Sequence, residues 1–419
     1  MRFDARFLIK FSLFCIIIFG LNLAYEYKNF KDFSKNSPIV LDAIVLQNYQ
    51  KIGKNGNKYF VLKLKSDEFS FYTTSKFKIN SKFIKATLNP TKVSFKDYLS
   101  KTFYMPNLSL KPIQNKSNWR LNLSQKITQN HQNPKIAELY SALYLATPIS
   151  KELRQNVTNW GIAHIIAISG FHLSLLFAML FFVFKPIYKP LQKKFFPYRD
   201  LNFDISLFIF SGAIFYLWIL DFTPSFFRSL IMGIVGFIFI CRGIKIFAIE
   251  NLFICIALAV SFCPNLIFSL GFYFSCLGVF FIFLYIKYFG DTNDLKNPLK
   301  IFLHSLGLSI FVYFCMNVPV YYFFHSASLF QLSVIVLGYV FVVFYPISII
   351  AHLFGFGDFL DIYLLNFLEF ANEQTQIYIS SWLFILFNLS LFLAIKFRLV
   401  GLIIALFGGI VYFFAFLSG

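Results

Sequence analysis

The stretch His164-Ile-Ile-Ala-Ile-Ser-Gly-Phe-His172 opens an apolar run that continues to Phe184. A run of this length can cross the roughly 30 Å of hydrocarbon in a bilayer. Polar and ionisable groups in a membrane helix are usually tied to a transport pathway or to a buried partner. Two histidines, a serine and a glycine inside this run therefore make it the strongest functional indication in the chain.

Similar apolar runs fill most of the sequence. The chain is 58% hydrophobic, contains 61 Phe and has a mean hydropathy of +0.66, which excludes an ordinary soluble protein of 419 residues. We expect a polytopic α-helical membrane protein with about 9–11 transmembrane helices. The runs lie near residues 7–24, 162–184, 203–222, 224–240, 247–262, 266–288, 301–323, 329–353, 381–396 and 399–417, with a further crossing or interfacial helix near 358–378.

Basic residues in the short loops indicate the orientation in the membrane. Arg2, Arg6 and Lys10 precede the first apolar run, and five Lys or Arg residues lie between 185 and 199, after the second. Placing these loops in the cytoplasm puts residues 25–136 in the periplasm. We expect an uncleaved membrane anchor at 1–24, a periplasmic domain at 25–136 and a polytopic channel domain at 137–419.

The periplasmic segment has the alternating, β-branched and aromatic pattern of short strands. The expected strands are Ile39–Gln47, Lys58–Lys65, Glu68–Thr74 and Phe83–Leu88, with a hairpin turn at residues 53–57. This pattern predicts a small β-barrel or sandwich. An OB-like fold fits its size, although the pattern does not separate it from other five-stranded barrels. We interpret residues 106–135, rich in Pro, Asn, Gln and Ser, as a linker or edge structure.

The same segment carries 20 Lys or Arg and 6 Asp or Glu, and so +14 of the chain's net charge of +19. Lysines mixed with aromatic residues are typical of surfaces that bind single-stranded nucleic acid without sequence preference. The alternative is that the aromatic residues form the core while the lysines are a solvated face, attracted to anionic lipid. The DNA-binding candidates are Lys51, Lys54, Lys58, Tyr59, Lys63, Lys65, Tyr72, Lys76 and Lys78.

Several roles are open for the two histidines. Ser169-Gly170 is a plausible place for a break in the helix. Two histidines are too few to hold a metal without a third ligand at suitable spacing. Ser169 with His172 does not make a hydrolase without oxyanion donors and a third residue. Packing inside a helix bundle is the simplest alternative to a functional role.

A second polar group lies in Asp221-Phe-Thr-Pro-Ser-Phe-Phe-Arg228. Thr223 is a suitable N-cap and Pro224 a suitable first helical residue, which predicts a tight turn between two spans. A charge at the centre of a membrane costs roughly 2.5–3.5 kcal/mol on insertion scales. We therefore expect Arg228 either to snorkel to the interface, to pair with Asp221 or to offer its guanidinium to phosphate oxygens.

Motifs for energy-coupled or nuclease chemistry are absent from the sequence. It has no Gly-x-x-x-x-Gly-Lys-Ser/Thr loop for a nucleotide-driven motor. Its six histidines do not form the His-x-His-x-Asp-His run of a metallo-β-lactamase-type nuclease. We expect a non-enzymatic protein without a cofactor or a metal.

Residues His164 to His172, preceded by Trp160-Gly-Ile-Ala163, resemble the signature of ComEC-type competence proteins, inner-membrane channels for single-stranded DNA in natural transformation. Two further stretches agree in order: Pro224-Ser-Phe-Phe-Arg228-Ser is similar to the family's Pro-Ser-x-x-Arg-Ala element, and residues 268–278 to its Phe-x-Leu-Ser-Phe segment. The resemblance covers about 138–345. The DNA-conduit candidates that it implies are His164, Ser169, Gly170, His172 and Arg228.

The resemblance also implies partners. They are single-stranded DNA, the inner membrane, a periplasmic DNA receptor and a cytoplasmic helicase-type motor. The chain departs from the family at Ala146-Thr-Pro-Ile-Ser150, where a Gly-Asp-Arg/Lys-Ser-like run is usual, and at Ser229, which replaces Ala. It stops at Gly419 without the metallo-β-lactamase-like domain of long members, so we expect a short form that needs a separate nuclease.

Two functions of other classes are alternatives to a DNA channel. One is a membrane enzyme in which His164 or His172 acts as a base on a lipid-linked substrate. The other is a permease for small solutes.

Overall fold

The computed structural model describes most of the chain and divides it into two compact units. One unit comprises residues 1–123 and 256–270, and the other comprises residues 124–255 and 271–419. The described residues are 5–35, 37–52, 57–66, 69–79, 81, 83–113, 119–243, 249–290, 297–371 and 373–417.

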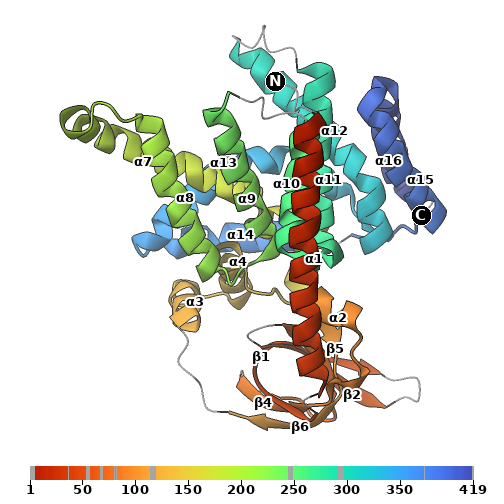
Figure 1. Cartoon of the computed structure of the whole chain (residues 1–419). Helices are drawn as coiled ribbons and strands as arrows, with labels where there is room; N and C mark the ends of the chain where they lie inside the picture. The colour runs from red at the N-terminus through yellow and green to blue at the C-terminus, as the bar shows by residue number, and fades with distance from the viewer. Residues whose placement is uncertain are drawn as a thin grey trace. The chain divides into compact units, whose positions relative to one another are not determined.

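The smaller unit is built on one six-stranded sheet, strongly curved in Figure 1, with the strand order β5-β3-β2-β1-β4-β6. Neighbouring strands are antiparallel except for the parallel pair β3 and β5. The strands are β1 (Ile39–Ile52), β2 (Lys58–Lys65), β3 (Ser70–Ser75), β4 (Phe83–Leu88), β5 (Thr102–Tyr104) and β6 (Asn107–Pro112).

The alternating pattern predicted the first four strands but not the last two. Strand β5 has three residues, too few to show an alternation, and β6 ends in Pro112. Because Pro lacks an amide hydrogen, a strand of this kind belongs at the edge of a sheet, which is where β6 lies. The predicted hairpin turn at 53–57 lies outside the described residues, apart from Asn57.

The first helix, α1 (Ala5–Lys35), continues well beyond the expected end of the anchor at residue 24. Its last turns carry Tyr27, Phe30 and Phe33, which are three residues apart and share one face. The ring of Phe33 lies 5.3 Å from Phe69 and 5.2 Å from Tyr98. The end of α1 therefore completes the core of the sheet together with η1 (Pro90–Lys92) and α2 (Phe95–Ser100).

Helices make up almost all of the chain that follows the sheet. Three of them, α4, α9 and α12, begin with proline at the first helical position. They are α3 (Trp119–Gln129), α4 (Pro134–Leu145), α5 (Lys151–Asn159), α6 (Ala163–Ile166), α7 (Gly170–Phe195), α8 (Leu201–Ile219), α9 (Pro224–Cys241), α10 (Ile249–Phe262), α11 (Leu270–Phe289), α12 (Pro298–Phe324), α13 (Val334–Leu353), α14 (Asp361–Phe370), α15 (Ser381–Lys396) and α16 (Arg398–Leu417), with short elements η2 (Pro264–Phe268), β7 (Ser326–Ala327), η4 (Leu329–Ser333), η5 (Gly357–Leu360) and β8 (Thr375–Gln376).

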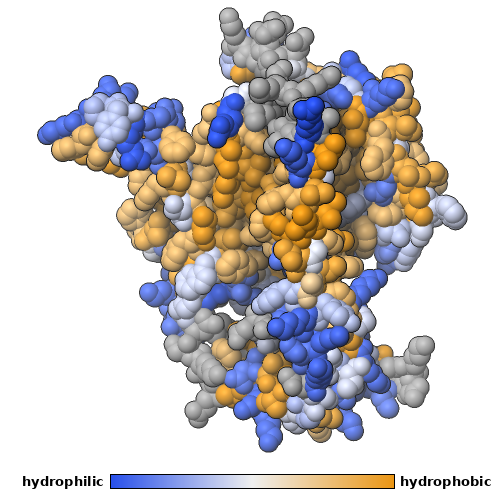
Figure 2. Space-filling view, in the orientation of Figure 1, coloured by the Kyte–Doolittle hydropathy of each residue, from blue (hydrophilic) through white to orange (hydrophobic). Residues whose placement is uncertain are grey.

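Eight helical segments of the described chain are long and apolar enough to cross a membrane, and two shorter apolar helices, α10 and α15, accompany them. Figure 2 shows a broad surface of hydrophobic residues over the helices, while hydrophilic residues gather where α7 ends in Lys193 and Lys194. A surface of this kind is stable against lipid and not against water. The protein is therefore a polytopic helical membrane protein, as the composition predicted.

Two of the expected spans differ from the structure. The run at 162–184 does not form one helix, because α6 ends at Ile166 and α7 begins only at Gly170. The segment 358–378, expected as a crossing or interfacial helix, is too short for a crossing in its described part, since its longest helix, α14, has 10 residues and a span needs about 20.

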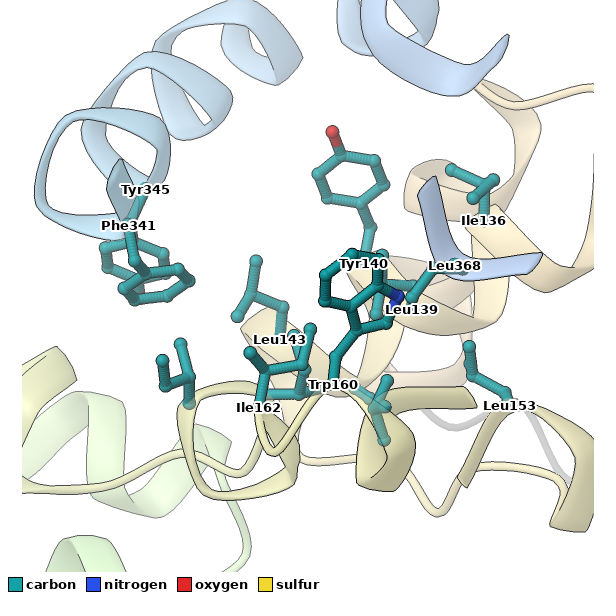
Figure 3. Close-up of a cluster of buried hydrophobic side chains, with 14 of the residues drawn as sticks. Ile136, Leu139, Tyr140, Leu143, Leu153, Trp160, Ile162, Phe341, Tyr345 and Leu368 are labelled. Carbon is teal, nitrogen blue, oxygen red and sulfur yellow. The ribbon is translucent and has the colours of Figure 1, made fainter. Parts of the chain in front are cut away.

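A buried cluster holds the segments that precede the break against α13 and α14 (Figure 3). It contains Ile136, Leu139, Tyr140, Leu143, Leu153, Trp160, Ile162, Phe341, Tyr345 and Leu368. The Trp160 ring stacks on Phe367 with 4.0 Å between ring centroids, and its Nε1 donates a hydrogen bond to the Phe367 carbonyl oxygen. Residues far apart in sequence thus fix the chain that leads into the histidine motif.

The packing of α1 on the sheet predicts a measurable stability effect. Replacing Phe33 with Ala should lower the free energy of unfolding of this unit by roughly 2–3 kcal/mol, since a partly buried Phe loses most of its contacts. Thermal unfolding of the purified protein in detergent, followed by circular dichroism, measures it. Phe77→Ala is the control, because Phe77 is 79% exposed and its loss should leave unfolding unchanged. Equal melting temperatures for both variants would contradict the packing.

Candidate functional site

The curved sheet presents one face on which lysine and tyrosine side chains alternate. Side chains two residues apart on a strand, and residues directly opposite on paired strands, share a face. Tyr59, Lys63 and Lys65 of β2 therefore share a face with Lys51 of β1 and Tyr72 of β3. We call these five residues, with Tyr49 and Tyr104, the basic aromatic face.

Lysines on this face lie against the aromatic rings. The Lys63 ammonium is 5.5 Å from the centre of the Tyr72 ring, and that of Lys51 is 5.8 Å from the centre of the Tyr49 ring. The Tyr49 and Tyr104 side chains remain 39% and 53% exposed. The face thus offers positive charge and accessible ring surface together.

A groove of about 1070 Å³ continues from this face. It shares Tyr59 and Tyr104 with the basic aromatic face and adds Lys76, Lys78 and the exposed Phe77. Of the other sequence-predicted residues, Lys58 is exposed at the start of β2 with the opposite side-chain direction, and Lys54 lies outside the described residues. The face and groove together therefore gather seven of the nine candidates.

In the larger unit, the histidine motif forms a break between two helices, as its Ser-Gly pair predicted. Ser169 is extended and serves as the N-cap of α7. The Nδ1 atom of His172 accepts a hydrogen bond from the Ser169 backbone amide at 3.2 Å, in the manner of a capping box. The imidazole thus satisfies an amide that the break leaves without a helical partner.

His172 is fully buried. Its ring meets Phe341 and Tyr345 of α13 edge to face, at 5.3 and 5.0 Å between centroids. Its Nε2 has no hydrogen-bond partner among the described residues. His164 and His172 lie eight positions apart, a spacing that fits one continuous helix. The break instead puts His164 on α6 and His172 on α7.

The second motif packs directly on this break. The Ser225 hydroxyl donates a hydrogen bond of 2.5 Å to the carbonyl oxygen of Ile168. A side-chain carbon on Gly170 would lie 2.8 Å from Ser229 Oγ and 3.2 Å from Ser229 Cβ. Only glycine fits here without a shift, so the glycine of one motif and the serines of the other form a single contact.

Arg228 lies at the same junction and is 2% exposed, so it does not snorkel to an interface. Its guanidinium donates to the carbonyl oxygen of Gly271, in the third motif, and to Ser229 Oγ, both at 3.3 Å. Its Cζ lies 5.9 Å from the centre of the Phe272 ring. Its Nε has no partner among the described residues, so the charge retains donor capacity.

His164 differs from the buried residues of the junction. Its side chain is exposed on the short helix α6. Of the two motif histidines, His164 is therefore the one whose ring is exposed at the surface of the structure.

Sequence reasoning missed several residues of the larger unit. Ser225 and Gly271 lie in the quoted motifs, but their contacts depend on how α9 and α11 meet the break. His131, His352 and Asp361 form a buried hydrogen-bonded group. No periodic pattern marks them, because they come from three separate segments. In the described chain, no three His, Cys, Asp or Glu side chains converge as a metal site.

The long apolar helices define the class, a polytopic membrane protein, and the break before α7 forms a junction of three motifs within it. A model of the competence protein family matches residues 146–418, about two thirds of the chain. The chain therefore belongs to the competence protein family. The matched range includes all three motifs of the junction. Searches of the curated proteins and of the solved structures found no significant match.

The contact between the first two motifs predicts the outcome of a double-mutant cycle. Gly170→Ala should lower the free energy of unfolding by about 1–3 kcal/mol, because the new methyl group overpacks against Ser229. Ser229→Gly should remove that clash, so the double variant should be more stable than the two single effects predict. Melting temperatures in detergent measure the coupling.

The control for this cycle is Gly212→Ala in α8, where an added methyl group meets nothing within 4 Å. It should melt like the native protein or slightly higher, since Ala favours a helix over Gly. Additive effects of Gly170→Ala and Ser229→Gly would show that the two residues are not in contact.

Proposed function

We propose that this protein carries single-stranded DNA across the inner membrane during natural transformation, as a ComEC-type channel. Its membership of the competence family supports a role in DNA uptake. The observation that supports single-stranded DNA as the transported molecule is the basic aromatic face with its groove, because it pairs positive charge with accessible rings.

The smaller unit would gather the strand. Lysines contact phosphates without regard to sequence, and bases of any identity stack on aromatic rings. In OB-folds, the face formed by strands 2 and 3 binds oligonucleotides. Here β2 and β3 carry Tyr59, Lys63, Lys65 and Tyr72 on one face, which supports an OB-like role for this sheet.

The larger unit would form the conduit. A polyanion cannot cross hydrocarbon, so its path needs a hydrated lining with local positive charge. Arg228 supplies such a charge, with hydrogen bonds only to neutral oxygens in the described contacts and with a free Nε. A guanidinium can bind phosphate oxygens. Because Arg228 is 2% exposed, this role requires the junction to open before a phosphate reaches it. His164 lies accessible on the segment leading into the break.

The positive-inside rule supports a cytoplasmic N-terminus and a periplasmic sheet unit. In this arrangement, a periplasmic receptor would deliver DNA to the basic aromatic face. A cytoplasmic helicase-type motor or the membrane potential would supply the driving force, and a separate nuclease would degrade the second strand.

The structure gives less support to a membrane enzyme that uses His172 as a base. Such a base must reach a proton of its substrate. His172 is fully buried, and its Nδ1 already accepts the Ser169 amide hydrogen.

The basic aromatic face predicts the salt dependence of DNA binding. For full-length protein in detergent and a labelled single-stranded oligonucleotide, the affinity should fall steeply as salt rises. Replacing Lys51, Lys63 and Lys76 together with Gln should reduce the log–log salt slope by about 2, given roughly 0.7 per single-strand phosphate contact. Fluorescence anisotropy at several salt concentrations measures both slopes.

A matched control removes the same charge elsewhere on the smaller unit. Lys28, Lys92 and Lys96 are exposed and lie on helical elements outside the sheet and the groove. Their joint replacement by Gln should leave the slope nearly unchanged. If both triple variants lose affinity equally, the binding is a net-charge effect and the face has no special role.

Uptake in cells tests the conduit itself. In a transformable strain that depends on this protein, Arg228→Gln should reduce the entry of labelled DNA into the cytoplasm at least tenfold, because the buried positive charge is lost. DNA resistant to external nuclease should still accumulate outside the inner membrane. Arg242→Gln, an exposed residue at the end of α9, is the control with the protein level matched by immunoblot. Normal entry with Arg228→Gln would remove this residue from the pathway.

A further inference from the structure

Three polar side chains meet inside the larger unit, outside the three motifs of the junction. His131 lies between α3 and α4, His352 lies in the last turn of α13, and Asp361 is the first residue of α14. His131 and Asp361 are 8% and 9% exposed. His352 is half-buried. Segments more than 200 residues apart in sequence are therefore joined through polar groups that are mostly shielded from water.

The hydrogen bonds form one continuous chain. His131 Nδ1 lies 2.9 Å from one Asp361 carboxylate oxygen and 3.1 Å from the other. His131 Nε2 faces His352 Nε2 at 3.0 Å. On its other side, His352 Nδ1 lies 2.7 Å from the backbone carbonyl oxygen of Ser348. Every ring nitrogen of the two imidazoles thus has a partner.

Each contact fixes a hydrogen atom. A carbonyl oxygen only accepts, so His352 Nδ1 must carry a hydrogen. Two nitrogens at 3.0 Å share one hydrogen, and so do His131 Nδ1 and the carboxylate. The two imidazoles and the carboxyl group therefore hold three of these hydrogens together. By comparison, two neutral imidazoles beside an ionised carboxylate hold only two such hydrogens.

We propose that His131, His352 and Asp361 form a buried proton-binding site that holds one proton more than two neutral imidazoles and a carboxylate. The count is the same whether the hydrogen between His131 and Asp361 resides on nitrogen or on oxygen. The occupied site has no net charge, which suits its buried position. Without the extra proton it carries one negative charge, and one of the three contacts must open.

The surroundings contain no other charge in hydrogen-bond contact with the two rings among the described residues. Tyr140 stacks on His131 at 4.6 Å between centroids, and the Tyr144 hydroxyl lies 3.2 Å from His352 Nδ1. Burial raises the pKa of both tyrosines, so they stay neutral. The nearby Lys135 is paired with Glu152 and Glu369. Asp361 therefore supplies the negative charge that balances the proton.

The turn after α13 leaves space for the His352 ring in this arrangement. A side-chain carbon on Gly357 would lie 2.9 Å from His352 Nε2, so glycine leaves room for the ring that faces His131. The three groups do not surround one point as metal ligands do, because Asp361 binds the nitrogen of His131 that faces away from His352.

Proton binding at this site would fasten the segment before α4 to α13 and α14. Loss of the proton leaves a negative charge and an unmade hydrogen bond at this contact, so it weakens the contact between these segments.

The proton is directly observable by spectroscopy of the full-length protein in detergent. With only six histidines in the chain, selective ¹⁵N labelling gives few ring signals. At pH 7.5 we expect either one ring with both nitrogens protonated or, by infrared spectroscopy, a protonated carboxyl group. Asp361→Asn and His131→Gln should each abolish that signal. His304→Gln, on α12, is the control and should only remove its own ring signals.

A wild-type protein with six neutral histidines and no protonated carboxyl group at pH 7.5 would overturn the proposal without any variant.

Discussion

The larger unit depends on one constraint: where one helix ends and the next begins within a few residues, backbone groups lose their helical hydrogen-bond partners and need others. Between α6 and α7 the helical hydrogen bonds stop, and side chains of two motifs take their place. His172 accepts the amide hydrogen of Ser169, and Ser225 donates to the carbonyl oxygen of Ile168. The residue types that first indicated function in the sequence therefore also make the break possible.

The sequence was sufficient for features that depend on local pattern. Apolar runs located the membrane helices, Thr223-Pro224 located the start of α9, and alternation located four strands. It was insufficient where a contact between distant segments decides the structure. The end of α1 lies beyond the anchor expected at 1–24, and Phe30 and Phe33 form a helical face there because the sheet supplies their partners. The three-residue strand β5 likewise exists only through its pairing with β3.

The candidate site shows the same division. Ser169 and Gly170 predicted a break in the helix, because serine and glycine both weaken a helix. The sequence did not show that Gly170 faces Ser229, because this contact depends on how α7 meets α9. The alternation of β2 was enough to place Lys63 and Lys65 with Tyr59. Their proximity to Lys51 and Tyr72 required the register of three strands.

The two buried polar groups of the larger unit differ in how completely they are satisfied, and the difference separates their roles. His131, His352 and Asp361 use every ring nitrogen and balance their charge, as groups that hold a structure together do. Arg228 makes two hydrogen bonds of 3.3 Å to neutral oxygens, beyond the usual range for such bonds, and leaves Nε unused. With the Phe272 ring 5.9 Å away and Nε unpartnered in the described chain, this guanidinium keeps hydrogen-bonding capacity that the fold itself does not use. The role proposed for Arg228 in DNA passage rests on that unused capacity at the junction of three motifs.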